Sequence, residues 1–245
     1  MLRSFYRGLR AFIKRMPGGV WLLSWTDPHI ISHRLLAQAM AQRATFAHGW
    51  MLDIGCGSKP YIHLFGHVKR YIGIDLPSPS PIDIYASGLE LPFCSSSFDT
   101  LLCNEVLEHV PEPSTLISEA ARILKPGGYL ILTTPQTWGL HLEPYDFYRY
   151  TPYGLRYLAT KHGLEVIEVV PTSGLWATWM QRFSDTVIFN YLRDQSPILK
   201  LIVSLALAPF LFLYYYLDKL FGKRGDSLDN VLVARKPASS SEHTR

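Results

Sequence analysis

Short apolar runs that end in glycine, aspartate or proline alternate along the chain with longer stretches in which apolar residues recur at helical spacing. This alternation is typical of β-strands connected by α-helices. The predicted strands cover residues 50–54, 70–76, 82–86, 98–104, 129–134, 164–170 and 230–235. The predicted helices cover 27–45, 114–124 and 151–163, with a short helix within 59–68. Because successive strands joined by helices run parallel, we expect an α/β protein with a doubly wound, mostly parallel sheet.

Capping residues mark the ends of the predicted helices. Asp27-Pro28 and Thr151-Pro152 each place a capping side chain before a proline at the first helical position. Gly163 ends the third helix, and Pro126-Gly127-Gly128 is expected to stop the second helix ahead of the fifth strand.

An apolar insertion separates the last predicted strand from the rest of the sheet. We therefore expect five segments along the chain. They are a basic head with a lead-in helix (1–45), the core of the fold (46–173), a hydrophobic helical insertion (174–228), the last strand of the core (229–236) and a disordered tail (237–245).

The insertion contains a run without charge, residues 201–217, with Pro209 in its middle. Seventeen residues are slightly too few for a comfortable membrane span. If residues 230–235 return to the sheet, a single crossing would also leave them on the wrong side of a bilayer. The open interpretations are an interfacial or re-entrant membrane element, a lid over a lipid-like acceptor and a dimer contact. We expect membrane association.

The net charge of the chain is only +4, but its basic residues are concentrated in the head. Arg3, Arg7, Arg10 and Lys14 recur at helical spacing and precede the first acidic residue, while apolar residues fill the other side. The pattern fits a solvated helix, a helix on an anionic membrane surface or an organellar targeting peptide. Of these interpretations, the membrane helix agrees with the apolar insertion.

Composition limits the class of protein. A chain of 245 residues that is 48% hydrophobic can bury one full α/β core with appendages. Cys56, Cys94 and Cys103 lack the paired spacing of a zinc site or a disulfide framework, which favours a reducing, cytoplasmic compartment. We expect a cytoplasmic protein, peripheral at the membrane, with no nucleic-acid partner; the oligomeric state stays open.

The candidate cofactor site follows the first strand. Gly55 and Gly57 come where the backbone must turn tightly and a ligand must approach main-chain atoms. A dinucleotide fingerprint needs a third glycine where this chain has Pro60. Asp53 would repel a pyrophosphate but would help to hold a cationic amino acid group. Asp75 ends the second strand, where a carboxylate can accept hydrogen bonds from both hydroxyls of a ribose.

Five segments carry a family resemblance. They are LDIGCGS (52–58), YIGID (71–75), LPF with SFD (91–93 and 97–99), NEVLEHVP (104–111) and LKPGG (124–128). In this order they resemble the successive motifs of the class I S-adenosylmethionine-dependent methyltransferases, in particular the ubiquinone/menaquinone-biosynthesis-like, type 11 group. The resemblance covers roughly residues 48–170.

The resemblance implies a Rossmann-like sheet of seven strands with the last one antiparallel, and S-adenosylmethionine as cofactor. It implies that Asp53, Gly55 and Gly57 line the methionine end of the cofactor. Eight residues are expected to bind the cofactor in all: Asp53, Gly55, Gly57, Asp75, Leu76, Ser87, Gly88 and Asn104. Ser87 and Gly88 stand where such proteins usually carry an acid and a small residue for adenine, so this chain departs from the family at that place.

Glu105 and His109 are the candidate catalytic residues, because they follow the fourth strand at the ligand-binding end of the sheet. His109 is the better base, since imidazole titrates near neutrality. The alternative is that His109 and Glu108 only orient the following helix. We expect no metal site. A second alternative is a divalent cation held by Glu105, Glu108 and His109 with His141, an arrangement that resembles small-RNA 2′-O-methyltransferases and certain ubiquinone-pathway O-methyltransferases.

The aromatic stretch after the fifth strand is the candidate acceptor site. Its expected substrate-binding residues are His141, Tyr145, Tyr148, Arg149 and Tyr150. The tyrosines would contact the acceptor or the sulfonium through cation–π attraction, and Arg149 would pair with an acidic group. The alternative is an ordinary connecting loop whose aromatic side chains pack on the sheet.

We therefore expect methyl transfer from S-adenosylmethionine to a small or lipid-linked acceptor, at oxygen. In-line displacement at a sulfonium needs alignment and desolvation more than covalent help. Two other functions stay open at this point. One is an NAD(P)-dependent oxidoreductase, and the other is a non-catalytic protein of methyltransferase fold that acts as a membrane adaptor.

Overall fold

The computed structural model describes residues 11–222 and 225–238. Within them the chain forms two compact units. The sheet unit comprises Ala37–Thr172 and Asp229–Arg245, and the helical unit comprises Met1–Leu36 and Ser173–Leu228.

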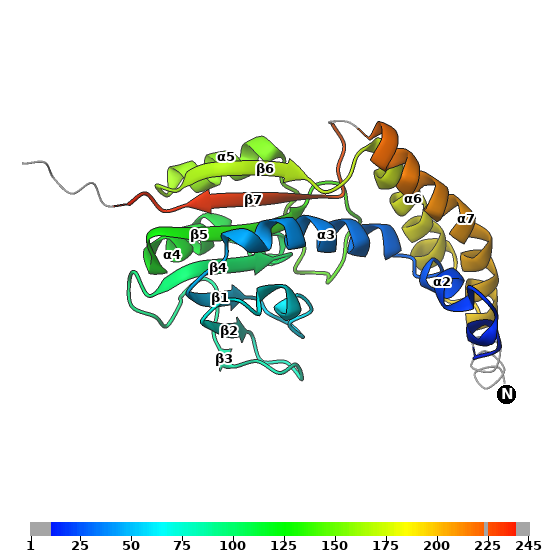
Figure 1. Ribbon diagram of the computed structural model, residues 1–245, viewed down its shortest axis with the longest axis horizontal. Helices are drawn as coiled ribbons and strands as arrows, with labels where there is room; N and C mark the ends of the chain where they lie inside the picture. The colour runs from blue at the N-terminus through cyan, green and yellow to red at the C-terminus, as the bar shows by residue number, and fades with distance from the viewer. Residues whose placement is uncertain (1–10, 223–224, 239–245) are drawn as a thin grey trace, which may run out of the picture. The chain divides into compact units, whose positions relative to one another are not determined.

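The sheet unit is built on seven strands in the order β3-β2-β1-β4-β5-β7-β6 (Figure 1). The strands are β1 (Trp50–Ile54), β2 (Arg70–Asp75), β3 (Ile84–Tyr85), β4 (Phe98–Asn104), β5 (Leu124–Pro135), β6 (Glu165–Pro171) and β7 (Asp229–Arg235). The first five pair in parallel, and β7 runs antiparallel to both β5 and β6. The predicted fold class, a mostly parallel seven-stranded sheet with an antiparallel last strand, is confirmed.

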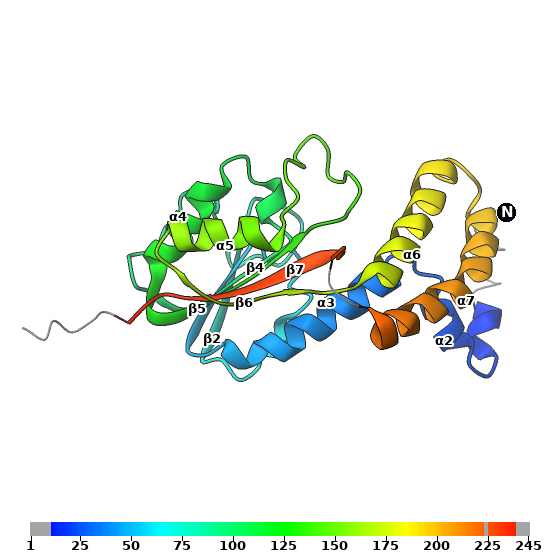
Figure 2. The same cartoon turned by 90° about the horizontal axis from the view of Figure 1, so that it is seen from above.

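Helices cover both faces of this sheet. Figure 2 shows α4 (Pro113–Ile123) and α5 (Pro152–Lys161) on one face and α3 (Ile30–Arg43) on the other. Pro113 and Pro152 occupy first-turn positions, and the Thr151 hydroxyl accepts a hydrogen bond from Gly154 N at 3.2 Å, as the capping pattern predicts. Leu116, Ala120 and Ala159 are fully buried against the strands, because β-sheets and amphipathic helices bury their apolar faces on one another.

The fifth strand begins earlier than its predicted start at residue 129, whereas the helix before it ends within one residue of its predicted end at 124. The helix ends at Ile123, and β5 already begins at Leu124 and runs through the glycines. The glycines let two backbones approach closely, since a Cβ at Gly128 would lie 2.8 Å from the Asp99 carbonyl oxygen. The strand here is tied to the chain beyond β7, where Gly127 N donates to Lys236 O at 2.8 Å.

Two further elements are shorter than the sequence pattern predicts. The third strand covers only Ile84–Tyr85 instead of 82–86, because an edge strand needs pairing on one side alone. The connection within 59–68 contains a single turn of 3-10 helix, Ile62–Phe65.

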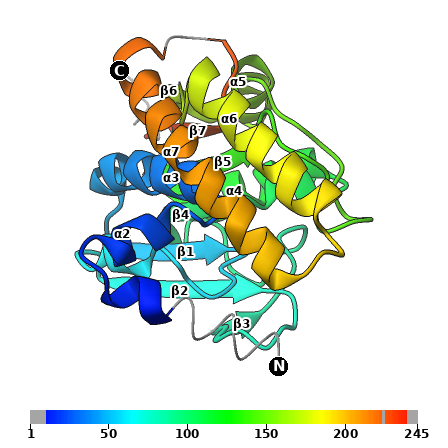
Figure 3. The same cartoon turned by 90° about the vertical axis from the view of Figure 1, so that its right-hand side faces the viewer.

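The helical unit joins stretches that lie far apart in the sequence. It contains α2 (Gly19–Ser24), the first part of α3, α6 (Leu175–Asp185), a π-helical turn (Thr186–Tyr191) and α7 (Pro197–Phe221). Figure 3 shows α6 and α7 side by side. They are antiparallel, because Asp218 near the end of α7 accepts hydrogen bonds from Gly174 N and Ala177 N at the start of α6, at 2.8 and 3.1 Å. Arg3, Arg7 and Arg10 of the predicted basic helix lie outside the described residues.

One described helix, α7, is long and apolar enough to cross a membrane when judged by length and composition alone. Its most apolar window has a mean hydropathy of 2.0 and is 22% buried. The strands that flank the insertion, β6 and β7, pair with each other over their length. Since both strands lie in one sheet, a single crossing by α7 is incompatible with this fold.

Candidate active site

The parallel strands end together and bring the predicted cofactor residues to one edge of the sheet. Ile54 of β1 pairs with Ile74 of β2 and with Cys103 of β4. The residues that follow these three, Gly55, Asp75 and Asn104, therefore emerge at the same edge, where the strand order reverses on either side of β1. Ligands of doubly wound folds bind at this position.

A cavity of about 240 Å³ lies at this edge. It is lined by Asp53, Gly55, Cys56, Gly57, Ser58, Pro60, Tyr61, Leu102 and Asn104. Four of the eight predicted cofactor residues are among them. The cavity is therefore built around the glycine turn that the sequence singles out.

The glycine turn depends on the absence of side chains. Gly55 has φ +72°, and a Cβ there would overlap the side chain of Val106. The turn is held by its own amides, since Gly55 N and Cys56 N both donate to the Ile74 carbonyl oxygen at 2.9 and 3.0 Å. The backbone of the turn is thus already in a conformation that lets a ligand approach it closely.

Asp75 is oriented by the same turn. One carboxylate oxygen accepts from Gly57 N at 2.8 Å, and the other accepts from Leu76 N at 2.7 Å. Each carboxylate oxygen keeps further lone pairs, so Asp75 can still accept hydrogen bonds from hydroxyl groups of a ligand. Leu76 follows as an exposed apolar side chain, which suits a contact with a planar ring.

Asp53 is buried beneath the turn, and its pKa is raised. Its side chain accepts a hydrogen bond from the Tyr71 hydroxyl. Burial raises the pKa of Asp53 to about 7, more than the Tyr71 hydrogen bond lowers it. A cationic group placed in the cavity would favour the ionised form of this carboxyl.

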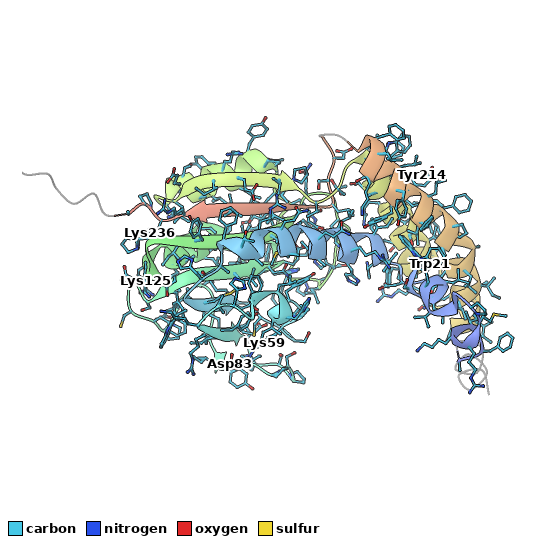
Figure 4. All side chains as sticks on the ribbon, in the orientation of Figure 1. Trp21, Lys59, Asp83, Lys125, Tyr214 and Lys236 are labelled. Carbon is cyan, nitrogen blue, oxygen red and sulfur yellow. The ribbon has the colours of Figure 1, made fainter. Side chains whose placement is uncertain are left out.

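A lysine clamp below the turn was not predicted from the sequence. Lys59 Nζ lies 2.7 Å from Asp83 Oδ2, and the same oxygen accepts from Gly73 N at 2.7 Å; Figure 4 labels both side chains. The pair connects the glycine turn with β2 and the segment before β3.

The predicted adenine contacts lie apart from the lining of this cavity. Ser87 Oγ accepts from Leu89 N at 3.2 Å within a tight turn. A Cβ at Gly88 would lie 3.0 Å from Leu116 Cδ1, so the glycine allows this turn to pack on α4. Asn104 does line the cavity, and its Oδ1 accepts from the Thr133 hydroxyl at 2.9 Å.

Three buried carboxyls lie beside the cavity. Burial raises the pKa of Glu105 to about 7 and, together with the charge of Glu105, that of Glu108 to about 9. Burial and the charges of both glutamates raise the pKa of Asp229 well above its ordinary range. Oε1 of Glu105 and Oε1 of Glu108 are buried without a hydrogen-bond partner in the protein. Unpaired buried carboxyl oxygens are costly, and they are typical of sites that await a ligand.

Two further residues at this edge, Tyr61 and Asp229, were not predicted from the sequence. Tyr61 lines the cavity, where burial and the charges of Glu105 and Asp229 raise its pKa to about 12. Asp229 reaches this edge because β7 is antiparallel, so its first residue pairs with Pro135 at the end of β5. The antiparallel direction predicts where Asp229 lies, whereas no local motif marks Tyr61.

Glu108, His109 and His141 form a cluster that could hold a metal ion. Their ligand atoms all lie within 4.8 Å of one another. His109 Nδ1 lies 2.6 Å from the Tyr145 carbonyl oxygen and His141 Nδ1 lies 3.1 Å from that of Gly139. A ring nitrogen beside a carbonyl must carry the hydrogen, which leaves Nε2 of each ring as the ligand atom.

This cluster fits a divalent cation in its chemistry. The unpaired Oε1 of Glu108 lies 3.6 Å from His109 Nε2, and burial lowers the pKa of His109, which keeps the imidazole neutral. A carboxylate with two neutral imidazoles is a common ligand set for divalent transition metals. Glu105, which the alternative ligand set also includes, lies outside the 4.8 Å group.

The predicted acceptor residues divide into two groups. Tyr145 and Tyr148 are exposed, and the Tyr148 hydroxyl donates to the Pro111 carbonyl at 3.0 Å. Arg149 is fully engaged, because it pairs with both oxygens of Asp146 at 2.6 and 2.7 Å and also donates to Gly139 O. Tyr150 is buried in the main core. Arg149 and Tyr150 therefore hold the loop that carries His141.

Comparison with known proteins agrees with this geometry. Residues 52–132 match the family profile described as a methyltransferase domain. An uncharacterized methyltransferase of Mycobacterium leprae is 32% identical over 143 residues, which are 53% of this chain and 46% of the relative. A ubiquinone biosynthesis O-methyltransferase of Thiobacillus denitrificans is 32% identical over 108 residues, which are 38% of this chain and 47% of the relative.

A solved structure shows the same fold. A SAM-dependent methyltransferase of Archaeoglobus fulgidus superimposes with a TM-score of 0.53 and 16% identity, over 83% of this chain and 94% of the other. The chain spans about half the length of the curated relatives it matches. The matched residues contain the glycine turn, Asp75, Asn104 and the Glu105–His109 segment. Residues 52–132 therefore form a methyltransferase domain, and the chain has the fold of an S-adenosylmethionine-dependent methyltransferase.

Proposed function

We propose that this protein transfers the methyl group of S-adenosylmethionine to an oxygen atom of a small or lipid-linked acceptor. The observation that carries the proposal is the cavity at the end of β1, whose glycine turn and buried Asp53 lie beside three carboxyls of raised pKa. In this arrangement Asp53 can bind a cationic cofactor, and the neighbouring carboxyls can exchange a proton with the acceptor.

The turn suits this cofactor better than a dinucleotide. Asp53 would lose its proton beside the cationic methionine end, and Asp75 would accept from ribose hydroxyls. Pro60 replaces the third glycine that lets a pyrophosphate rest on a helix, and only a single 3-10 turn, Ile62–Phe65, follows. These features disfavour the nicotinamide oxidoreductase.

Oxygen as the acceptor atom rests on the cluster of Glu108, His109 and His141. A hydroxyl becomes a better nucleophile as it loses its proton, and neutral His109 is positioned to take it. If a divalent cation occupies His109 Nε2 instead, together with Glu108 and His141, His109 can no longer take the proton, and the cation would act as a Lewis acid on the hydroxyl. One relative of similar sequence carries the name O-methyltransferase, which supports the same choice.

The first test is cofactor binding. Isothermal titration of the full chain with S-adenosylmethionine should give one site, and titration with NAD(P) should give none. Radioactive methyl groups should then pass to phenolic or lipid-linked hydroxyl compounds with release of S-adenosylhomocysteine. Binding of NAD(P) alone would refute the proposal, and cofactor binding without transfer to any hydroxyl acceptor would identify a non-catalytic adaptor.

The metal site has a separate test. Titration with Mn²⁺ should show binding to the wild type that Glu108→Gln and His141→Gln both lose, with His63→Gln, an exposed histidine, as the matched control. Methyl transfer by the wild type should fall in excess chelator and return with added cation. If the wild type binds no Mn²⁺ and keeps full activity in chelator, His109 acts without a metal.

A further inference from the structure

Helix α6 buries several polar side chains and exposes large apolar ones, which is the opposite of what a helix in water does. The side chains it buries include Thr178, Gln181 and Asp185, whereas Trp179 and Phe183 on its outer face are 65% and 56% exposed. The buried Gln181 is hydrogen-bonded at both ends of its amide, since Nε2 donates to Asp185 Oδ1 at 2.9 Å and Oε1 accepts from Ser32 N at 3.2 Å. A helix in water gains free energy by the opposite arrangement.

Helix α7 also presents apolar side chains outward. Its buried stripe follows helical spacing and contains the polar Ser204 and Asp218. Its outer face carries Ile202, Phe210 and Leu213, each about half-exposed, within the run 201–217 that has no charge. A patch of this kind on two neighbouring helices marks a surface that contacts an apolar phase or partner.

The two helices enclose a groove of hydrocarbon character. Its volume is about 380 Å³, and it is lined by Trp179, Met180, Phe183, Leu207, Phe210 and Tyr214. Every one of these side chains is apolar or aromatic. Such a groove accommodates an alkyl chain, and its lining offers a polar peptide backbone only the indole N–H of Trp179 and the hydroxyl of Tyr214 as hydrogen-bonding groups.

Charge indicates what lies against this surface. The helical unit contains twelve Lys and Arg and five Asp and Glu, whereas the sheet unit contains twelve and fifteen. Lys200 and Lys219 lie on either side of the uncharged run, and Lys219 Nζ lies 4.6 Å from the ring centre of Tyr215. Cations and aromatic rings at the rim of an apolar surface match an anionic lipid interface. A second copy would bring a net positive unit against another one, which electrostatics disfavours.

We propose that the outer face of α6 and α7 inserts into one leaflet of an anionic lipid bilayer, without crossing it, and that the groove between the helices receives a lipid acyl chain. The two ends of the insertion return to one sheet through β6 and β7, so both helices enter and leave on one side. Figure 4 labels Tyr214 of α7 and Trp21 of α2 among the side chains of this unit. Trp21 contacts Phe212 of α7 edge to face at 5.2 Å, which adds α2 to the apolar surface.

Flotation of the full-length protein with vesicles tests this proposal. The wild type should float with vesicles of phosphatidylcholine and phosphatidylglycerol, and more weakly with phosphatidylcholine alone. The triple variant Trp179→Ser, Phe183→Ser, Phe210→Ser should lose binding by about tenfold or more. A matched triple variant on exposed residues of the sheet unit, Tyr153→Ser, Tyr157→Ser and Ile167→Ser, should float like the wild type.

Two further measurements separate the alternatives. Lys200→Gln with Lys219→Gln should weaken binding to the anionic vesicles and leave binding to neutral vesicles unchanged. Brominated acyl chains should quench tryptophan fluorescence in the wild type and less in Trp179→Phe. S-adenosylmethionine binding should survive in every variant, which shows that the sheet unit is folded and keeps this test independent of the proposed chemistry. Flotation undiminished in the first triple variant, or a dimer in solution that this variant dissociates, would overturn the proposal.

Discussion

At the scale of single residues, the glycine turn gives the sharpest prediction. Gly55→Val should abolish S-adenosylmethionine binding, because Gly55 has φ +72° and a side chain there would overlap Val106. Gly66→Ala is the matched control, since Gly66 has an ordinary backbone conformation and open space around its Cβ position. Titration calorimetry measures both affinities, and circular dichroism checks that each variant is folded.

Asp53→Asn is a second variant for the same site, because it keeps the size of the side chain and removes the charge. It should bind the cofactor at least tenfold more weakly, corresponding to about 1.4 kcal/mol. Affinity equal to the wild type in a folded Asp53→Asn protein would contradict the role of this carboxyl.

The residues that the sequence predicted at the site share one property. Asp53, Gly55, Asp75 and Asn104 all stand at the ends of strands, where the apolar pattern breaks. A local pattern reveals such positions. It does not reveal which side chains pair with one another: Arg149 forms an ion pair with Asp146, three residues earlier, so its guanidinium is not free for an acidic substrate group.

At the scale of secondary-structure elements, Asp218 connects the two long helices of the insertion. It is buried and caps the start of α6 from the far end of α7. Asp218→Ala should lower the free energy of unfolding by roughly 1–3 kcal/mol, because two amide donors lose their acceptor. Chemical denaturation monitored by circular dichroism measures the loss. Asp194→Ala, at an exposed position in the loop before α7, should change it by less than about 0.5 kcal/mol.

The elements were predicted best where the sequence carries both a periodicity and a boundary signal. The strands at 50–54 and 98–104 have their predicted bounds, since each is an apolar run that ends at a turn or polar residue. The fifth strand was placed too late, because glycines and a proline usually end an element. Here the pairing of Gly127 with Lys236, more than a hundred residues away, overrides the local signal.

At the scale of the whole molecule, the division into two units is the feature that the sequence pattern did not show. The pattern divides the chain into consecutive segments, whereas the described residues up to Leu36 form one unit with 173–228. Ser32 N and the Pro28 carbonyl both hydrogen-bond to Gln181, a residue about 150 positions away. Such pairing depends on tertiary packing, which hydrophobic periodicity along one segment cannot encode.

The buried acids of the whole molecule determine how its stability changes with pH. Asp53, Glu105, Glu108, Asp185 and Asp229 all have a folded-state pKa raised by burial. Their ordinary values are 3.8 for Asp and 4.5 for Glu, so near pH 5 the folded state binds protons that the unfolded state has released. The stability that these protons contribute is present at low pH and is lost as the pH rises through the folded pKa values.

We therefore expect the free energy of unfolding to fall between pH 5 and pH 8. The carboxyls with a lowered pKa, such as Asp83, Asp99 and Asp146, are ionised in both states over this range and add no slope. His109 and His162, whose pKa values are lowered, oppose the trend but are fewer than the five acids. Each retained proton contributes up to about 1.4 kcal/mol per pH unit.

Urea denaturation at successive pH values measures this slope. Chelator is present so that no cation competes with protons at Glu108. Asp185→Asn should make it shallower, and a stability that rises from pH 5 to pH 8 would show that these carboxyls are ionised in the folded protein.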